Sequence, residues 1–256
     1  MTALVLAGGP RDDVAALDPS AANKAFVHIA GRTLLRRVIE ALRGVPRVGR
    51  IIVVAPPSVA THPDVLLADE WRPSGERITQ SLAAGLAGLE PAQLALIAVA
   101  DLPILTGVAI EEFCRAAEES GCDIAYSCVE RQRHEGQFSG VPHTWARLRE
   151  GEFCGGGLVA LRPRANPALA HFLDRLGAAR KRPLRLASIF GYDVLVRYAL
   201  RRLTIADAER RASELVQAAV RAVPSPYPEI AINVDRPSDV PLAERLVQQA
   251  DAAMQR

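Results

Sequence analysis

The chain has 256 residues, 49% of them hydrophobic, which suits one large α/β domain or one domain with a sizeable insert. Its formal net charge of +2 excludes a protein that binds polyanions over its whole surface. No apolar run approaches the roughly 18–20 residues that span a bilayer, and the N-terminus shows no secretory signal. We therefore expect a cytoplasmic protein with no stable membrane insertion.

The cysteines point to the same location. There are four, Cys114, Cys122, Cys128 and Cys154, and they form neither a CxxC pair nor a Cys/His cluster with zinc spacing. Because reducing compartments disfavour disulfides, we expect free thiols.

Strand and helix patterns alternate through the first half of the chain. Continuous apolar runs are typical of strands buried on both faces, at residues 3–7, 50–55, 94–100 and 123–129. Apolar residues at helical spacing predict helices at 33–44, 76–89 and 108–120. This rhythm predicts an α/β protein with a Rossmann-like three-layer α/β/α architecture and a mostly parallel sheet.

The rhythm breaks after residue 129. A polar stretch leads to Gly155-Gly156-Gly157 and a short strand, LVAL, and helices are predicted at 167–176, 184–202 and 204–222. The run 229–234 reads as a returning strand before a closing helix. We expect an α/β core of residues 1–128 with 229–256, and a mainly helical insert or lid, 129–228, over its ligand-binding edge.

The first predicted strand runs straight into Gly8-Gly9. Two glycines expose backbone N–H groups at the carboxyl edge of a sheet, where polyphosphates can be cradled. Arg11 and Lys24 could supply positive charge to such a cradle and to a leaving pyrophosphate. The alternative is that both are solvated loop residues.

Two aspartates follow predicted strands. Asp101 ends the strand at 94–100, and Asp235 ends the run at 229–234. Ligands bind at the carboxyl ends of parallel strands, and two carboxylates with phosphate oxygens and water suit Mg²⁺. The alternative for Asp101 is a turn, and for Asp235 a turn or a helix cap.

The helix predicted from Glu76 carries two lines of residues. Its apolar stripe is Ile78, Leu82, Leu86 and Leu89, and a neighbouring line presents Arg77, Ser81 and Gly85. A nucleotide base or ribose could lie along that second line, although an ordinary amphipathic helix gives the same pattern.

Other features of the sequence are weaker indications of function. No histidine has an acid partner at a recognisable spacing, and the GxSxG and GxxxxGK[ST] motifs are absent. The predicted insert is basic, through Arg180, Lys181, Arg182, Arg185, Arg197, Arg201, Arg202, Arg210 and Arg211. These side chains form either a solvated helical face or a grip for an anionic acceptor. No stacking module accompanies them, so we expect no nucleic-acid partner.

Five motifs in this order resemble the nucleotidyltransferases of the molybdenum cofactor guanylyltransferase-like (MobA-like) group: LVLAGG with Arg11 and Lys24, AGRTLLRRVIEAL, GERITQSLAAGL, ADLPIL and INVDRPSDVPLAE. That group shares a GT-A-like nucleotide-diphospho-sugar transferase fold with the methylerythritol phosphate cytidylyltransferases and the sugar-phosphate nucleotidyltransferases. The matches cover about residues 1–128 and 229–248. They are specific for the superfamily but not for a substrate.

The resemblance implies transfer of a nucleoside monophosphate from an NTP to a phosphate or hydroxyl acceptor, with release of pyrophosphate. It implies Mg²⁺ or Mn²⁺ held by Asp101 and Asp235, a nucleotide-binding core in residues 1–128 with 229–256, and an acceptor-binding region in the insert 129–228, and it is compatible with a homodimer. The basic insert itself suggests an anionic small-molecule acceptor. The implied catalytic residues are Lys24, Asp101 and Asp235. The implied substrate-binding residues are Leu6, Ala7, Gly8, Gly9, Arg11, Lys24, Arg77, Ser81 and Gly156.

The glycine loop departs from the family pattern. The usual signature has a further glycine before the arginine and a proline before the lysine, whereas Pro10 follows Gly9 here and Asn23 precedes Lys24. Arg11 is therefore the least secure of the implied residues.

Two other functions fit the same fold. One is a metal-dependent glycosyltransferase, although Asp101-Leu102-Pro103 lacks the second acid of a DxD triplet. The other is a non-catalytic nucleotide-binding protein.

Overall fold

The computed structural model describes residues 1–179 and 188–254. Among them, eight strands form one sheet with the order β10-β7-β9-β6-β1-β4-β5, and β8 joins by pairing with β9. The strands are β1 (Thr2–Leu6), β4 (Arg50–Ala55), β5 (Glu70–Pro73), β6 (Ala95–Val99), β7 (Ile124–Glu130), β8 (Ala146–Leu148), β9 (Gly151–Leu161) and β10 (Val220–Pro224). Neighbours are parallel except where β9 meets β6, β7 and β8.

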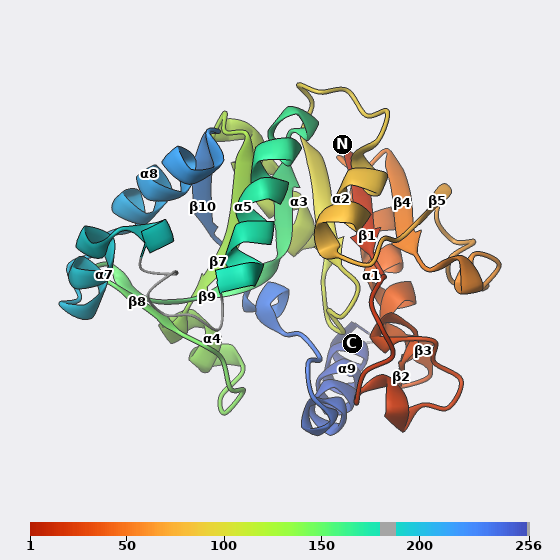
Figure 1. Cartoon of the computed structure of the whole chain (residues 1–256). Coiled ribbons are helices and arrows are strands. Elements are labelled where there is room, and N and C mark those ends of the chain that lie inside the picture. The colour runs from red at the N-terminus through yellow and green to blue at the C-terminus, as the bar shows by residue number, and fades with distance from the viewer. Residues whose placement is uncertain (180–187, 255–256) are drawn as a thin grey trace.

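Helices cover both faces of this sheet (Figure 1). They are α1 (Leu34–Arg43), α2 (Ile78–Leu86), α3 (Gly107–Glu119), α4 (Arg131–Gln137), α5 (Asn166–Ala179), α7 (Tyr192–Ala199), α8 (Ile205–Val216) and α9 (Val240–Met254). Ala3 and Val5 of β1 belong to one core cluster with α1, α3 and α9, while Leu4 belongs to a second with α2 and α8. Alternate residues of one strand thus enter opposite cores, which confirms the three-layer α/β/α prediction. None of the described helices has both the length and the apolar character of a membrane span.

The first half of the chain matches its predicted elements closely. The four predicted strands appear as β1, β4, β6 and β7, and the three predicted helices as α1, α2 and α3, with α2 shorter at both ends than expected. Thr204 and Asp207 form a capping box at the start of α8. All four cysteines are buried and free.

One prediction beyond residue 150 is wrong, and two have the wrong bounds. The run 229–234 is not a strand: it begins as a 3₁₀ helix, Pro228–Ala231, and continues as irregular chain, because a fully buried apolar run does not by itself distinguish these conformations. The short strand LVAL is only the end of β9, which lies between β6 and β7. The helix predicted at 204–222 stops at Val216, and β10 follows. The helix predicted at 184–202 falls partly outside the described residues.

The segment 129–228 therefore contributes strands as well as helices. Its strands β8, β9 and β10 belong to the same sheet as β1 and β6, so the sheet continues across the predicted boundary between core and insert. The division into core and lid stays a prediction.

Three consecutive glycines let β9 pass close to its neighbours. A Cβ on Gly157 would lie 2.8 Å from the side chains of Leu102 and Val99, and a Cβ on Gly156 would overlap Ser127 Oγ. Ser127 is fully buried, and its Oγ donates to the Leu158 carbonyl at 2.7 Å. Glycine is required here by close approach rather than by backbone conformation.

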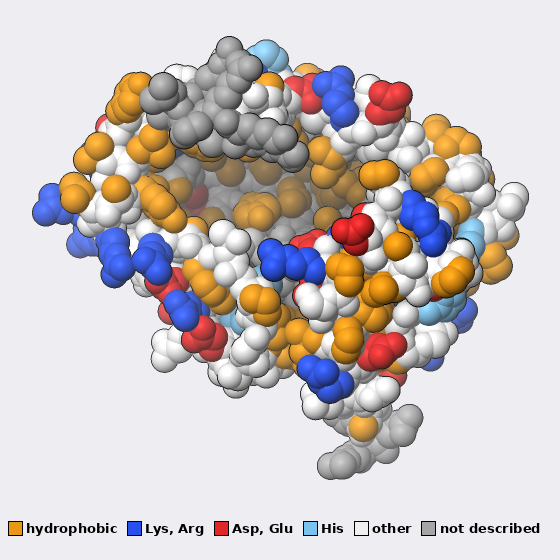
Figure 2. Space-filling model, turned by 60° about the horizontal axis from the view of Figure 1, so that its bottom comes forward, with side chains coloured by type: hydrophobic (Ala, Val, Ile, Leu, Met, Phe, Trp, Pro, Cys, Tyr) orange, Lys and Arg blue, Asp and Glu red, His pale blue; other side chains and the backbone are white. Residues whose placement is uncertain are grey.

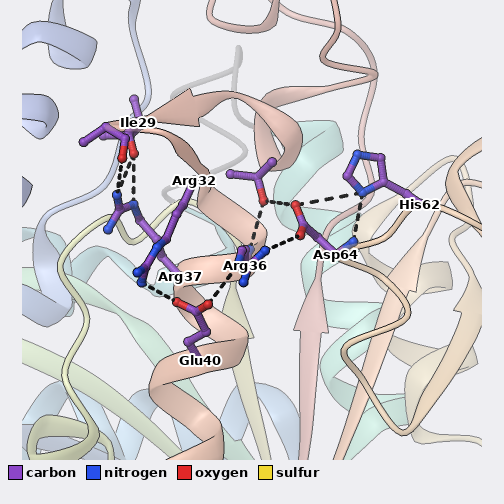
Figure 3. Close-up of polar contacts among 9 residues, drawn as sticks. Ile29, Arg32, Arg36, Arg37, Glu40, His62 and Asp64 are labelled. Atoms are coloured by element: carbon purple, nitrogen blue, oxygen red, sulfur yellow. Dashed lines mark hydrogen bonds and ion pairs between the residues drawn. The ribbon is translucent and has the colours of Figure 1, made fainter.

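Polar contacts fix the chain between Lys24 and helix α1 (Figure 3). Thr33 Oγ1 accepts a hydrogen bond from the first turn of α1 and donates to Asp64 Oδ2 at 2.7 Å. Arg37 of α1 donates to the Ile29 carbonyl at 2.6 Å, which ties the small hairpin of β2 (His28–Ile29) and β3 (Arg32–Thr33) to the helix. The backbone that follows Lys24 is thus anchored at both ends of the hairpin.

Gly156→Ala is expected to destabilise the protein by about 1–3 kcal/mol, because the added methyl displaces Ser127 from its hydrogen bonds to β9. Urea denaturation measures the change. Gly177→Ala in α5 is the matched control, since a Cβ there meets nothing within 4 Å and alanine favours helices by up to about 1 kcal/mol. Equal effects of the two substitutions would contradict the packing argument.

Candidate functional site

The loop after β1 is held from inside the protein. Asn23 is 2% exposed, and its Nδ2 donates to the Ala7 carbonyl at 2.9 Å and to the Gly9 carbonyl at 3.4 Å. The Ala7 N–H donates to the Val54 carbonyl at 2.9 Å, and Gly9 has a φ of 120°, which disfavours any residue with a side chain. The diglycine turn is therefore preformed at the carboxyl edge of the sheet.

A cavity of about 260 Å³ opens between this turn and the start of α2. The diglycine turn and the loop before α2 lie close together: a Cβ on Gly8 would lie 2.8 Å from Ser74 Cβ. Ser81 Oγ accepts a hydrogen bond from the Gly75 N–H at 3.0 Å and so shapes the loop before α2. This space is called the nucleotide cavity below.

The structure brings most of the predicted substrate-binding residues to this cavity. Those that line it are Leu6, Gly8, Gly9, Lys24, Arg77 and Ser81. Ala7 instead lies buried behind the turn, and Gly156 lines a different cavity. Arg11 folds back on its own loop, where it donates to the carbonyls of Asp18, at 3.1 Å, and Ala21. It does not line the cavity, in keeping with its displaced position in the sequence signature.

The sequence misassigned one residue of this cavity. Ile78 was predicted to belong to the buried stripe of its helix, but its side chain is 61% exposed and lines the nucleotide cavity. Leu82 and Leu86 of the same stripe are buried as expected. The first turn of α2 thus turns an apolar surface towards the cavity, beside the side chain of Arg77.

Lys24, Asp101 and Asp235 meet at the edge of the nucleotide cavity. Lys24 Nζ lies 2.6 Å from Asp101 Oδ2 and 2.8 Å from Asp235 Oδ1, so one ammonium bridges both carboxylates. The backbone brings the acids together, because the Val234 N–H donates to the Asp101 carbonyl at 3.1 Å. The side chain of Asp101 is 13% exposed and that of Asp235 57%, so the pair has one buried and one open member.

Burial and ion pairing shift the pKa values of Asp101 and Lys24 in opposite directions. Burial raises the pKa of Asp101 above its ordinary value, and the ammonium of Lys24 only partly offsets that effect. Burial alone would lower the pKa of Lys24, but the two carboxylates together raise it, so the ammonium stays charged.

The donors at this cluster fit a small divalent cation. Asp101 Oδ1 is buried and has no hydrogen-bond partner among residues 1–179 and 188–254, which is costly unless a ligand completes it. No three His, Cys, Asp or Glu side chains in the described part of the chain form a metal cluster. A cation here would therefore be held by two carboxylates and by ligands from outside the protein, an arrangement common for Mg²⁺.

Two further cavities continue from the acid pair on the side away from the diglycine turn. The first, of about 310 Å³, is lined by Asp101, Asp235 and the glycines of β9, and the second, of about 410 Å³, extends from Asp235 to His143. They share Tyr126, Gly155, Asn233 and Asp235, and together we call them the acceptor cavity. Figure 2 faces this edge of the sheet and shows a hollow with hydrophobic side chains in its depth and charged side chains at its margin.

Sequence reasoning missed the aromatic lining of the acceptor cavity. Tyr126 is 45% exposed there, and His143 lines its far end. Behind His143 lies His134, fully buried with ring centroids 4.4 Å apart, and Trp145 packs on both rings. No sequence signal marked these residues, because the fold alone brings residues 126 and 143 to one wall.

Among the described residues, no Lys or Arg side chain of the predicted insert lines the acceptor cavity. Arg197 and Arg210 pair with Asp207, and Arg211 pairs with Glu214 and donates to the Phe190 carbonyl. Within the described residues, the basic side chain that lines the acceptor cavity is Arg236, outside the predicted insert. The predicted residues Arg180, Lys181, Arg182 and Arg185 lie outside the described part of the chain.

Asn23→Ala is expected to destabilise the protein by about 2–3 kcal/mol, because it leaves buried carbonyls of the diglycine turn without a donor. The loosened turn should also weaken binding of any phosphate ligand. Urea denaturation and calorimetry with NTPs measure the two effects. Asp13→Ala, at an exposed position of the same loop, should change neither. An unaltered stability of Asn23→Ala would contradict the anchoring role.

His134 should make the protein sensitive to mild acid. Burial and the neighbouring His143 lower the pKa of His134 from 6.5 to about 4. Between these two pH values, the imidazole of His134 is protonated in the unfolded chain and neutral in the folded one. The free energy of unfolding should be steady above about pH 6.5 and fall by up to about 3 kcal/mol between pH 6.5 and 4. Denaturation at pH 7.5 and 5 tests this. His134→Gln should flatten the profile, and His171→Gln, exposed on α5, should not.

Comparison with known proteins identifies the family of the chain. Residues 3–222 match the family model of the MobA-like NTP transferase domain. A solved structure described as a hypothetical transferase from Thermus thermophilus is 32% identical, with a TM-score of 0.81, over 93% of this chain and 98% of that one. Among proteins with curated functions, no match is found.

More distant structures share the fold. A 4-diphosphocytidyl-2C-methyl-D-erythritol synthase from Anaerococcus prevotii is 13% identical with a TM-score of 0.58, over 96% of this chain and 97% of that one. The 2-C-methyl-D-erythritol 4-phosphate cytidylyltransferase of Thermus thermophilus is 19% identical with a TM-score of 0.54, over 96% and 98%. The family match over most of the chain shows that the protein belongs to the MobA-like NTP transferase domain family and is a nucleotidyltransferase.

Proposed function

We propose that the protein transfers a nucleoside monophosphate from an NTP to a small acceptor, releases pyrophosphate, and requires Mg²⁺ or Mn²⁺. The observation that carries this proposal is the meeting of Lys24, Asp101 and Asp235 between two cavities. A group-transfer enzyme needs its two substrates on opposite sides of the reacting atom, and this cluster separates two such spaces.

The nucleotide cavity suits the NTP. Backbone N–H groups of the diglycine turn and the ammonium of Lys24 would bind the phosphates, and the exposed face of Ile78 would support the base or ribose. Bound between Asp101 and Asp235, a divalent cation would neutralise charge on the reacting phosphates. Lys24 would stabilise the charge that develops on the leaving pyrophosphate.

The acceptor cavity suits a small molecule rather than a polymer. Its two parts measure about 310 and 410 Å³, within the size range of small-ligand sites. Its neutral polar groups include those of Tyr126, His143 and Asn233. Its acids are Asp101, Asp235 and Asp239, and Arg236 is its basic side chain. We infer an acceptor that carries hydroxyl groups and few negative charges, such as a monophosphate.

A glycosyltransferase remains the second candidate, because the fold also serves nucleotide-sugar donors. Its usual second acid is missing, since Leu102 and Pro103 follow Asp101 and Leu102 is fully buried. Asp235 supplies a second carboxylate from a distant part of the chain instead. This arrangement favours nucleotidyl transfer.

Asp101→Asn is expected to lower pyrophosphate release at least 100-fold, because the buried carboxylate at the cluster becomes neutral. The assay incubates each of the four NTPs and Mg²⁺ with a panel of phosphorylated and hydroxylated metabolites. Asp13→Asn, exposed and outside both cavities, is the matched control and should retain wild-type activity. Removal of Mg²⁺ by EDTA should abolish release, and added Mg²⁺ should restore it. Full activity of Asp101→Asn would refute the proposal.

A further inference from the structure

The gap between Asp101 and Asp235 already holds a cation that belongs to the protein. Lys24 Nζ is within 2.8 Å of an oxygen of each carboxylate. The remaining oxygen of Asp235 accepts from Asn233 Nδ2, and the remaining oxygen of Asp101 is buried without a partner in the described chain. Without nucleotide, the ammonium therefore sits where a divalent cation would be shared between the acids.

A divalent cation and this ammonium cannot occupy the same place. An ion ligated by both carboxylates would lie within a few ångströms of Nζ, and like charges so close repel strongly where solvent screening is weak. Asp101 is 13% exposed, so screening by water on that side is limited. Metal binding therefore requires the side chain of Lys24 to leave the pair.

The structure shows where the ammonium can go. Lys24 also lines the nucleotide cavity with Gly8 and Gly9 of the diglycine turn, where the proposed function places the phosphates. Its four-carbon side chain can turn from the acids to a phosphate without moving the backbone, which the hairpin after it holds in place. Bound phosphate oxygens would replace the carboxylates as partners of Nζ.

We propose that Lys24 is an internal competitor for the divalent cation and makes metal binding conditional on nucleotide. In the nucleotide-free protein it pairs with both acids, offsets one of their two negative charges and keeps metal out. A polyphosphate draws it away, so the metal enters together with the nucleotide or after it. This inference rests on the proposed function for the identity of the ligand, but the competition itself is a property of the nucleotide-free protein.

The test measures Mn²⁺ binding by electron paramagnetic resonance without nucleotide. Lys24→Met removes the ammonium and should raise the affinity for Mn²⁺ at least tenfold over wild type. Lys24→Arg keeps the positive charge and should bind Mn²⁺ as weakly as wild type. Arg77→Met is the matched control, since it removes a cation of the same cavity whose partner is Asp174, 3.1 Å away, and should change the affinity less than threefold.

A second measurement excludes a merely structural role for Lys24. Calorimetry in EDTA measures binding of each NTP without metal, and Lys24→Met should weaken that binding at least tenfold while it strengthens Mn²⁺ binding. General damage to the site would weaken both. Adding Asp101→Asn to Lys24→Met should abolish the gained Mn²⁺ binding, which places the ion at the acid pair.

Thermal denaturation keeps the proposal testable if Lys24→Met is unstable. Two carboxylates without their counter-ion should lower its melting temperature, and Mn²⁺ should restore it to a greater extent than it stabilises wild type. A Lys24→Met protein no more responsive to Mn²⁺ than wild type, by resonance and by melting, overturns the inference. Failure of pyrophosphate release with every acceptor would instead count against the proposed function and leaves the Mn²⁺ result interpretable.

Discussion

Three distant segments of the chain are joined by the ion pairs of one lysine. Lys24 follows the loop of β1, Asp101 follows β6, and Asp235 comes just before α9, yet all three side chains meet within hydrogen-bonding distance. Burying Asp101 costs free energy, and a charged partner with good geometry reduces that cost. The hydrogen bond from Val234 to the Asp101 carbonyl secures the same junction through the backbone. Asp101, at the centre of this junction, lines both the nucleotide cavity and the acceptor cavity.

The sequence predicts the nucleotide half of the molecule well, because physical signals there are local. Buried parallel strands read as unbroken apolar runs, and Gly8-Gly9 marks a strand that ends at a ligand edge. The placement of Asp235 is instructive: the strand expected before it does not exist, yet the residue reaches Asp101. An apolar run of six residues indicates burial reliably and conformation poorly, and burial against β7 and β9 was enough to bring Asp235 to the sheet edge.

The lining of the acceptor cavity, and one residue of the nucleotide cavity, could not be predicted in the same way. Ile78 has the spacing of a core residue, and its exposure depends on how the loop before α2 approaches the diglycine turn. Tyr126 and His143 become neighbours of one cavity only because β9 enters the sheet between β6 and β7. One interpretation of the basic helices was a grip for an anionic acceptor, but among the described residues Arg197, Arg210 and Arg211 pair with Asp207 and Glu214 on α8. Such outcomes depend on tertiary partners that a single sequence does not reveal.

Because β9 is antiparallel to β6 and β7, the two cavities are lined by different kinds of connection. Parallel strands place their carboxyl ends at the reactive edge, so the loops that follow β1 and β6 line the nucleotide cavity. In the proposed function, these loops would bind the phosphates that every NTP has. β9 runs antiparallel to β6, so its first residues lie at that edge instead. In the stretch before it, residues 131–150, the segment 141–144 lines the acceptor cavity and does not line the nucleotide cavity. Under the proposed function, insertions or exchanges in that stretch would change which acceptor is bound and would leave the groups that bind the phosphates unaltered.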